Sequence, residues 1–313
     1  MSSSPSRSTQ AHQLMLAGQS KLIEAFEALE IAKASAARFE SHEWLREQLG
    51  GGKAKVIERG AIFERAGVNV SAVRGKRVPP SLAAQHPGSE GKPYFATGIS
   101  MVLHPQNPYV PSFHANYRYF EIGDEADGLF WFGGGADLTP NYAFEEDIRH
   151  FHHSLKAQCD RHDTSTAQSL YPRLKTTCDT YFYLKHRKEM RGIGGIFFDE
   201  FEVPGEGDFA RGLAFAKDGI DTILAAYLPI IQKRQDSPFG EREREWQLYR
   251  RGRYVEFNLI YDRGTLFGLQ TGGNIEAILM SMPLYAHWRF DYQPEVGSPE
   301  AAMLDYLQPR DWV

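Results

Sequence analysis

The segment Phe113-His-Ala-Asn-Tyr-Arg-Tyr-Phe120 alternates polar and apolar side chains with the two-residue period of a β-strand. Successive side chains of an extended chain point to opposite faces, so this strand has one polar face and one aromatic face. The polar face carries His114, Asn116 and Arg118, and the aromatic face carries Tyr117 and Tyr119. The aromatic face indicates a core. The polar face indicates either solvent exposure or a polar pocket.

Several other segments also have the pattern of strands. Strands are predicted at 68–73, 95–103, 115–122 and 129–132, with a short buried strand at 196–199. They fall in hairpin-like pairs and not in a repeating strand–helix–strand order, which favours an α+β fold with an antiparallel sheet. The chain has no internal repeat and no clear linker. We therefore predict a single domain over residues 13–313, after a disordered N-terminal tail at 1–12.

The remaining segments are predicted as helices, one hairpin and loops. Helices are predicted at 13–49, 144–159, 171–190, 209–232, 241–251 and 274–282. The helix at 241–251 is strongly charged, which is typical of a solvated surface. Segments 254–261 and 266–269 are predicted to pair as a hairpin. The run Gly133-Gly-Gly135 predicts a loop, and a lone Asp137 after such a loop is most often a helix cap or a turn residue.

The overall composition limits the classes of protein to which this chain can belong. It has 313 residues, of which 42% are hydrophobic and 24% charged, as in an ordinary globular protein. The net charge of −5 argues against a nucleic-acid binder. Two cysteines without a CxxC motif fit a reducing compartment, so a cytoplasmic location is expected. No apolar run approaches the roughly 20 residues of a membrane helix, and no glycine run has dinucleotide or P-loop spacing, so no organic cofactor is expected.

The run Lys185-His-Arg-Lys-Glu-Met-Arg-Gly-Ile-Gly-Gly-Ile-Phe-Phe-Asp-Glu200 combines basic side chains, glycines and an apolar strand that ends in an acid. Arg187 and Arg191 are four residues apart, so on a helix they would share one face, and two guanidiniums there are suited to binding carboxylates. The glycines at 192, 194 and 195 allow a tight turn or close approach to a ligand. The alternative is a surface helix with solvated charges, followed by an ordinary loop.

This run resembles the signature of the oxygen-dependent coproporphyrinogen III oxidase family. The matching residues are Lys175, Cys178, Tyr181-Phe-Tyr183, His186-Arg187, Glu189, Arg191-Gly192, Gly194-Gly195 and Phe197-Phe-Asp199. Thr177 stands where the family has tryptophan. Similar stretches recur between Gly51 and Trp288. The resemblance implies a large antiparallel sheet flanked by helices on both faces, and a homodimer to which residues 254–288 contribute.

The same resemblance implies an activity. Two propionates of coproporphyrinogen III would be oxidatively decarboxylated to vinyls, giving protoporphyrinogen IX, CO2 and hydrogen peroxide in haem biosynthesis. Dioxygen would be the co-substrate, with no organic cofactor and with a divalent metal as an open possibility.

Roles for particular side chains also follow from the resemblance. His114 would transfer protons, and Asp137 would face the pyrrole N–H groups. Substrate contacts are implied for Ser100, Asn116, Tyr117, Arg118, Arg187, Arg191, Gly272, Gly273 and Asn274. Metal ligands are implied at His104, His114, His152 and His186, although no HExxH motif supports them.

A second position, near the presumed site, also departs from the family pattern. The glycine turn that ends in arginine in the family ends here in Asn274. The alternative reading is therefore a non-catalytic dimer on the same fold that binds a tetrapyrrole or haem without oxygen uptake.

Overall fold

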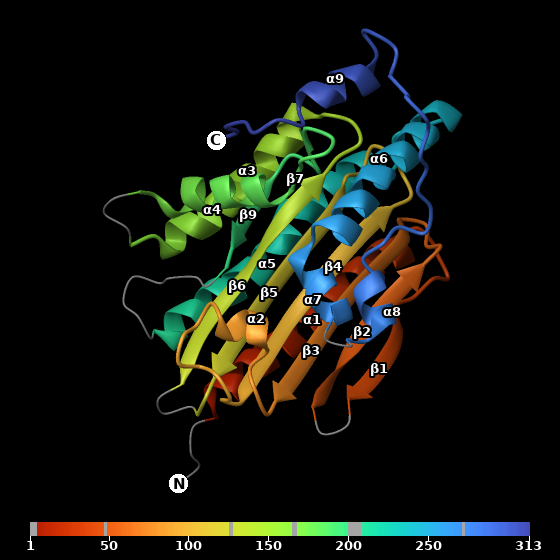
Figure 1. Ribbon diagram of the computed structural model, residues 1–313. Helices are drawn as coiled ribbons and strands as arrows, with labels where there is room; N and C mark the ends of the chain where they lie inside the picture. The colour runs from red at the N-terminus through yellow and green to blue at the C-terminus, as the bar shows by residue number, and fades with distance from the viewer. Residues whose placement is uncertain (1–4, 47–48, 125–127, 165–167, 200–207, 271–272) are drawn as a thin grey trace.

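The computed structural model describes residues 5–46, 49–124, 128–164, 168–199, 208–270 and 273–313. Within these ranges a seven-stranded antiparallel sheet forms the centre of the molecule (Figure 1). In their order across the sheet the strands are β1 (Glu40–Arg46), β2 (Gly50–Glu58), β3 (Phe63–Gly75), β4 (Tyr94–Pro105), β5 (Ser112–Ile122), β6 (Leu129–Thr139) and β9 (Gly195–Phe198). A separate hairpin joins β7 (Tyr183–Leu184) to β8 (Glu189–Met190).

Helices cover both faces of this sheet, as the sequence predicted. They are α1 (Arg7–Ala32), α2 (Pro80–Ala83), α3 (Glu145–His162), α4 (Leu170–Tyr181), α5 (Phe209–Arg234), α6 (Glu241–Ile260), α7 (Arg263–Gln270), α8 (Ile275–Leu279) and α9 (Pro299–Asp305). The helices α1 and α5 pack against one face, and α6, α7 and α8 lie over the other (Figure 1). In the part of the chain that is described, no helix is both long enough and apolar enough to cross a membrane.

The face under α1 and α5 is the core. Tyr117 and Tyr119 of β5 point into it and are completely buried. Phe113 stacks on Tyr227 of α5 with ring centroids 4.9 Å apart, and Gly219 of α5 gives the Tyr117 ring its space. Each buried aromatic side chain stabilises the fold by about 2 kcal/mol through the water it excludes.

On the opposite face of the sheet, glycines leave space that long side chains from neighbouring residues fill. A Cβ added at Gly133 would come within 2.8 Å of the Arg118 guanidinium, and one at Gly52 within 2.4 Å of the Trp44 ring. At Gly67 the same atom would meet the Met280 sulfur at 2.7 Å. Each of these distances is shorter than van der Waals contact. The glycines therefore let the sheet carry arginine, indole and thioether side chains without raising its surface.

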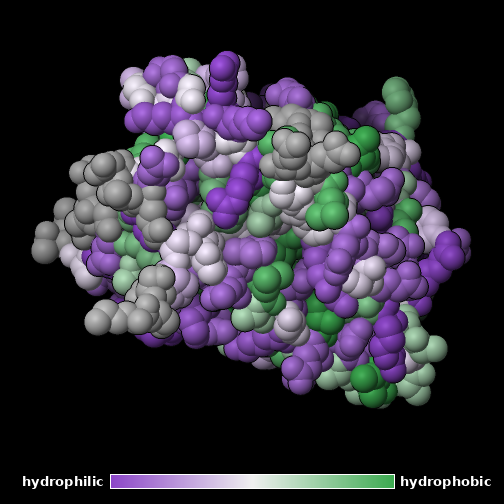
Figure 2. Space-filling view, turned by 90° about the horizontal axis from the view of Figure 1, so that it is seen from below, coloured by the Kyte–Doolittle hydropathy of each residue, from purple (hydrophilic) through white to green (hydrophobic). Residues whose placement is uncertain are grey.

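Hydrophobic side chains show only in separate clusters on the largely hydrophilic surface seen from the lower end of the sheet (Figure 2). Scattered exposure of this kind is normal for a folded chain.

Two predictions near the N-terminus are wrong. The first helix ends at Ala32 and not at residue 49, because the chain turns back into strand β1. The same helix begins at Arg7, inside the tail that was predicted to be disordered. Ser6 caps it by accepting from the Thr9 backbone N–H, and Ala11 and Met15 of its first turns are buried.

The predicted hairpin at 254–269 is also wrong. Residues 254–260 continue the helix α6, and residues 263–270 form α7. The predicted solvated helix at 241–251 is instead largely buried, because Arg251 pairs with Glu64 of β3 and donates to the Pro105 carbonyl. Contacts so distant in the sequence leave no mark on the local pattern of α6.

The glycine run at 133–135 lies inside β6 and not in a loop. Gly194 has a φ of +79° and begins the approach to β9, where a Cβ on Gly195 would meet the Ala136 carbonyl oxygen at 2.0 Å. The sequence predicted a tight turn or close approach to a ligand for the glycines at 192, 194 and 195. At Gly195 the close approach is to the neighbouring strand β6.

Candidate active site

Three polar side chains meet where β5 and β6 pair and the β8–β9 segment crosses them. His114 and Asp137 are directly opposite each other in the register of the two strands, and His114 Nδ1 lies 2.7 Å from Asp137 Oδ1. Arg191 Nη2 donates to both oxygens of Asp137, at 2.9 and 2.7 Å. Its Nη1 donates to the Asn258 amide oxygen at 2.7 Å. Side chains from β5 and from the residue that follows β8 therefore bond to the Asp137 carboxylate of β6. Asn258 of α6 in turn holds Arg191 in place.

Aromatic rings enclose the Arg191 guanidinium. Its central carbon lies 4.1 Å from the Phe182 ring centroid, 4.6 Å from that of Tyr254 and 4.9 Å from that of Phe257. Stacking and cation–π attraction favour a guanidinium in such a site. The side chains of Arg191 and Asp137 are only 1% and 2% exposed. A pair buried this deeply is fixed, since separating it would leave an unpaired charge in the interior.

Burial and pairing act on Asp137 in opposite directions. Burial alone would raise the pKa of its carboxyl, but the Arg191 charge and the bond from His114 hold that pKa below the ordinary value. Burial likewise disfavours the charged form of Arg191, while Asp137 keeps the pKa of the guanidinium raised. Asp137 is therefore an anion at neutral pH.

This arrangement is suited to proton transfer through the imidazole. The His114 side chain is 20% exposed, so it is the member of the group that meets solvent and ligands. A carboxylate at Nδ1 fixes the orientation of the ring and leaves Nε2 free of that contact. The geometry thus presents His114 as an acid–base group and Asp137 as its buried partner.

A hollow of about 280 Å³ opens on the same face of the sheet. Ser100 of β4 and Asn116 of β5 lie opposite each other in its floor. Arg118 extends the floor, and Phe267, Gly273 and Asn274 line the side formed by the α7–α8 region. Two polar residues of the strand at 113–120, Asn116 and Arg118, therefore line a pocket, and His114 lies outside its lining on the same face.

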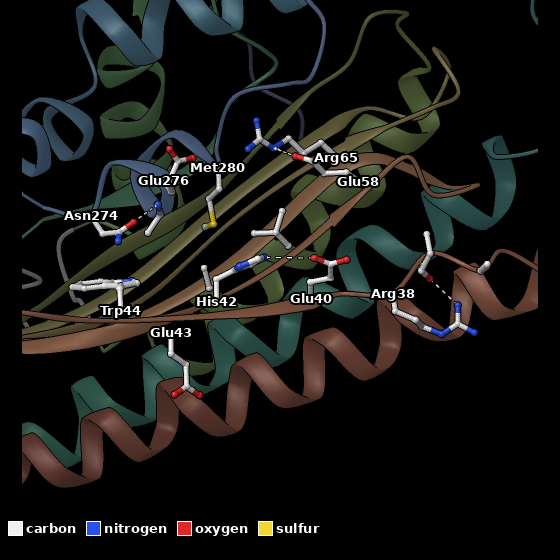
Figure 3. A pocket seen from close by; sticks show the side chains of 15 residues that line it. Arg38, Glu40, His42, Glu43, Trp44, Glu58, Arg65, Asn274, Glu276 and Met280 are labelled. Carbon is white, nitrogen blue, oxygen red and sulfur yellow. Dashed lines mark hydrogen bonds and ion pairs between the residues drawn. The ribbon is translucent and has the colours of Figure 1, made fainter.

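A larger hollow of about 710 Å³ adjoins the first one, and both are lined by Trp44, Asn274 and Ala277. Figure 3 shows Trp44 of β1 lying below Asn274. The Trp44 indole N–H has no hydrogen-bond partner among the described residues. The charged groups of the larger hollow include an ion pair between Glu58 and Arg65, 3.3 Å apart. The indole thus separates a hollow with charged walls from one with a mainly neutral floor.

Two arginines from different elements meet at the end of β9. Arg118 Nη2 of β5 lies 2.7 Å from Asp199 Oδ1, and Arg263 Nη2 of α7 lies 3.4 Å from Asp199 Oδ2. Arg118 also donates to the Asn116 side chain at 3.0 Å. Both guanidiniums are partly exposed, so this part of the cleft can attract carboxylates.

Comparison with known proteins agrees with this geometry. The family model described as Coproporphyrinogen III oxidase matches residues 10–312. The chain belongs to the coproporphyrinogen III oxidase family. A relative named oxygen-dependent coproporphyrinogen-III oxidase, from Coxiella burnetii (strain Dugway 5J108-111), is 51% identical over 297 residues, which cover 94% of this chain and 92% of the relative. The resemblance found in the sequence is therefore confirmed at the level of the family.

The family signature does not place its two arginines together. Residues 183–190 form the β7–β8 hairpin and not the last turns of a helix, so Arg187 and Arg191 share no helical face. Arg187 lies in the turn of this hairpin and donates to both oxygens of Glu256, at 2.9 and 2.7 Å. His186 bonds to the same carboxylate at 2.7 Å. Burial alone would raise the pKa of Glu256, but the hydrogen bonds from Arg187 and His186 and the charge of Arg253 lower that pKa to about 2.

Glu256 was missed because its segment was read as a strand. A lone acid that follows three arginines at 250, 251 and 253 was the available signal. Its ion pairs join the hairpin to α6, so Arg187 has a partner within the chain at the position where a substrate carboxylate was expected.

The four histidines implied as metal ligands of this family lie apart. His152 bonds to the Tyr171 hydroxyl at 2.8 Å and the Ile193 carbonyl at 3.0 Å, and burial lowers its pKa to about 3. His104 bonds to the Ser112 hydroxyl and the Ser281 carbonyl, and burial lowers its pKa to about 4. His186 is held by Glu256. The described residues contain no group of three or more potential ligands that could hold a metal ion, so these side chains do not fit one shared metal site.

Three implied substrate contacts need separate comment. Tyr117 points away from the cleft into the core, so its assignment as a contact is wrong. Gly272 lies outside the described residues. Asn274, which stands where the family has arginine, caps α8 by accepting from the Ala277 backbone N–H at 2.8 Å. Its side chain therefore has a structural role besides lining both hollows.

Proposed function

We propose that this chain catalyses the oxygen-dependent oxidative decarboxylation of two propionates of coproporphyrinogen III, giving protoporphyrinogen IX in haem biosynthesis. The observation that carries the proposal is the fixed His114–Asp137–Arg191 group on the same sheet face as the cleft. The family membership and the named relative support the same reaction.

The side chains on this face of the sheet suit the charge of such a substrate. A porphyrinogen is a ring with acidic side chains, and the hollow is lined by Gly98, Ser100 and Asn116 beside Arg118. Arg118 and Arg263 supply the positive charge that carboxylates need. Neutral hydroxyl and amide groups on the floor are suited to the pyrrole N–H groups.

The reaction balances without an organic cofactor. For each side chain, R–CH2–CH2–COO⁻, O2 and one proton give R–CH=CH2, CO2 and H2O2. The C–COO⁻ bond breaks, and the electron pair it releases forms the vinyl double bond. One C–H bond of the CH2 next to the ring also breaks, and its two electrons pass to dioxygen. The proton from that bond and the added proton complete H2O2. His114 would exchange the pyrrole proton during this transfer, since Asp137 fixes the orientation of its partly exposed ring.

The arginines would hold mainly the carboxylates that do not react. A carboxylate loses its charge when CO2 departs, so a tight ion pair would stabilise the ground state more than the transition state. Positioning by Arg118 and exclusion of water from the cleft are then the main contributions of the protein.

The direct test is oxygen uptake by the chelator-treated chain with coproporphyrinogen III. We expect uptake with formation of protoporphyrinogen IX and release of CO2. The matched control is the same protein with mesoporphyrinogen-type rings that have only two propionates in non-reacting positions, which should give no CO2. Tight binding of coproporphyrinogen III without oxygen uptake would contradict the proposed catalysis and favour the non-catalytic dimer that binds a tetrapyrrole. Loss of uptake only after chelation would show a metal requirement.

We also propose a homodimer that uses part of residues 254–288. Large apolar side chains are exposed over this region, namely Leu259, Ile260, Phe267, Leu269 and Ile275. A partner covering these elements would remove the exposed apolar groups from water. Sedimentation velocity would give twice the chain mass if this is so, and a single-chain mass would contradict it. A cytoplasmic location belongs to the same proposal, since both cysteines are buried free thiols.

A further inference from the structure

The carboxylate of Asp199 stands between the two partly exposed arginines of the cleft. Each of its oxygens faces a different guanidinium, with Oδ1 at 2.7 Å from Arg118 and Oδ2 at 3.4 Å from Arg263. Both guanidinium carbons lie 5.9 Å from the Phe197 ring centroid, so the two side chains are gathered around the end of β9. A bound carboxylate from another molecule would take the same kind of place.

This ion pair differs from the buried one beside it. The side chains of Arg118, Asp199 and Arg263 are 33%, 38% and 62% exposed. Exposed pairs are screened by water and contribute only about 0.2–1 kcal/mol, so a competing carboxylate can replace Asp199 at little cost. The pair between Arg191 and Asp137 is almost completely buried and has no such freedom.

We infer that Asp199 is an internal counter-ion that occupies a substrate carboxylate site and is displaced when a propionate binds to Arg118 and Arg263. The inference rests on the proposed function. It makes Asp199 a residue that sets affinity: in the free protein it neutralises the arginines, and it weakens binding by competing with the ligand. Acids that reach only one of the two guanidiniums would not displace it, so it also favours substrates with a well-placed carboxylate.

The alternative role for Asp199 is to orient Arg118 for the substrate. The two roles predict opposite signs. Removing a competitor tightens binding, whereas removing an orienting group weakens it. The sign of one binding measurement therefore separates them.

The test compares wild type with Asp199→Asn, which keeps the size of the side chain and removes its charge. The probe is coproporphyrin III, the oxidised ring with the same four propionates, and its fluorescence gives the Kd. We expect Asp199→Asn to bind about threefold more tightly at low salt, with the difference shrinking as salt screens the charges. The matched control is Asp218→Asn. Asp218 accepts from Arg161 and His162 on the helical layer away from the cleft, and its change should leave the Kd unaltered.

Unchanged or weaker binding by Asp199→Asn would overturn the inference. Asp199→Ala provides a second variant if the asparagine amide itself bonds to Arg118, and it should also bind more tightly. Wild-type turnover of coproporphyrinogen III is measured on the same preparations. Absent turnover would contradict the proposed function, whereas normal turnover with the wrong sign of the Kd change would contradict only the role of Asp199.

Discussion

The two faces of strand β5 use neighbouring residues for different purposes. Tyr117 and Tyr119 fill the core beneath α5, and the space left by the neighbouring core side chains fixes their positions. His114 and Arg118 alternate with them on the other face, and their position is decided by the charged partners Asp137 and Asp199. Stability and chemistry are therefore separated by one residue along the same strand.

The glycines show the same division. On the core face Gly219 makes room for an aromatic ring, so its lack of a side chain serves packing. On the cleft face Gly133 makes room for the Arg118 guanidinium, so its lack of a side chain serves binding. Substitution of Gly219 should therefore lower the stability of the fold, whereas substitution of Gly133 should weaken substrate binding.

The largest expected effect is on the cleft face, at Asp137→Asn. The variant loses the anion that orients His114 and pairs with Arg191, and kcat should fall about 100-fold to 10,000-fold. Steady-state oxygen uptake with coproporphyrinogen III measures this. Asp147→Asn is a control that also breaks a well-buried ion pair, here with Arg234 on the helical layer, and should leave kcat near the wild-type value. Equal losses in both variants would mean that Asp137 acts only through stability.

The glycine pair gives the next effect. Gly219→Ala puts a Cβ 2.4 Å from the Tyr117 ring and should lower the free energy of unfolding by about 1–3 kcal/mol with little change in KM. Gly133→Ala should leave stability nearly unchanged but raise KM about tenfold, because Arg118 has to move. Urea unfolding and steady-state kinetics on both variants test the contrast. A loss of stability at Gly133 with unchanged KM would show that the two faces are not separable in this way.

The smallest effect at neutral pH concerns His152, a buried histidine of α3, and it grows only as the pH falls. Burial lowers the pKa of His152 to about 3, so the unfolded chain, with an ordinary histidine pKa near 6.5, binds the proton more readily than the fold does. The stabilisation is complete above pH 6.5 and falls as pH drops from about 6.5 towards 3, by up to about 1.4 kcal/mol per pH unit. His152→Gln should flatten the pH dependence of the unfolding free energy in that window. An unchanged slope in the variant would mean that other groups, such as His104, govern acid sensitivity.

The sequence predicted best where a pattern repeats within one element. The alternation at 113–120 correctly separated the core face from the cleft face, and the strands at 95–103 and 196–199 were found within a few residues. These features depend on periodicity and on pairing between consecutive strands, which local sequence records. The sequence analysis named His114 and Asp137 separately, and their contact across paired strands was not predicted.

Other features depend on partners far along the chain. A spacing of four residues fits a hairpin turn as well as a helix, so Arg187 and Arg191 were placed on a helix that ends at Tyr181. The charged face of α6 was read as solvated because Glu64, the partner of Arg251, is 187 residues away. Ion pairs over such separations become visible only when the fold is known.

The register between β5 and β6 has a consequence for how the chain must assemble. His114 faces Asp137 only in this register, and a shift of one residue would turn one partner of the pair to the opposite side of the sheet. The same shift would bring the glycines of β6 under the wrong side chains. A misassembled copy would then lack both a sound interior and a working acid–base pair. Quality control that removes poorly folded chains would therefore also remove chains with this shifted register, which lack the His114–Asp137 pair.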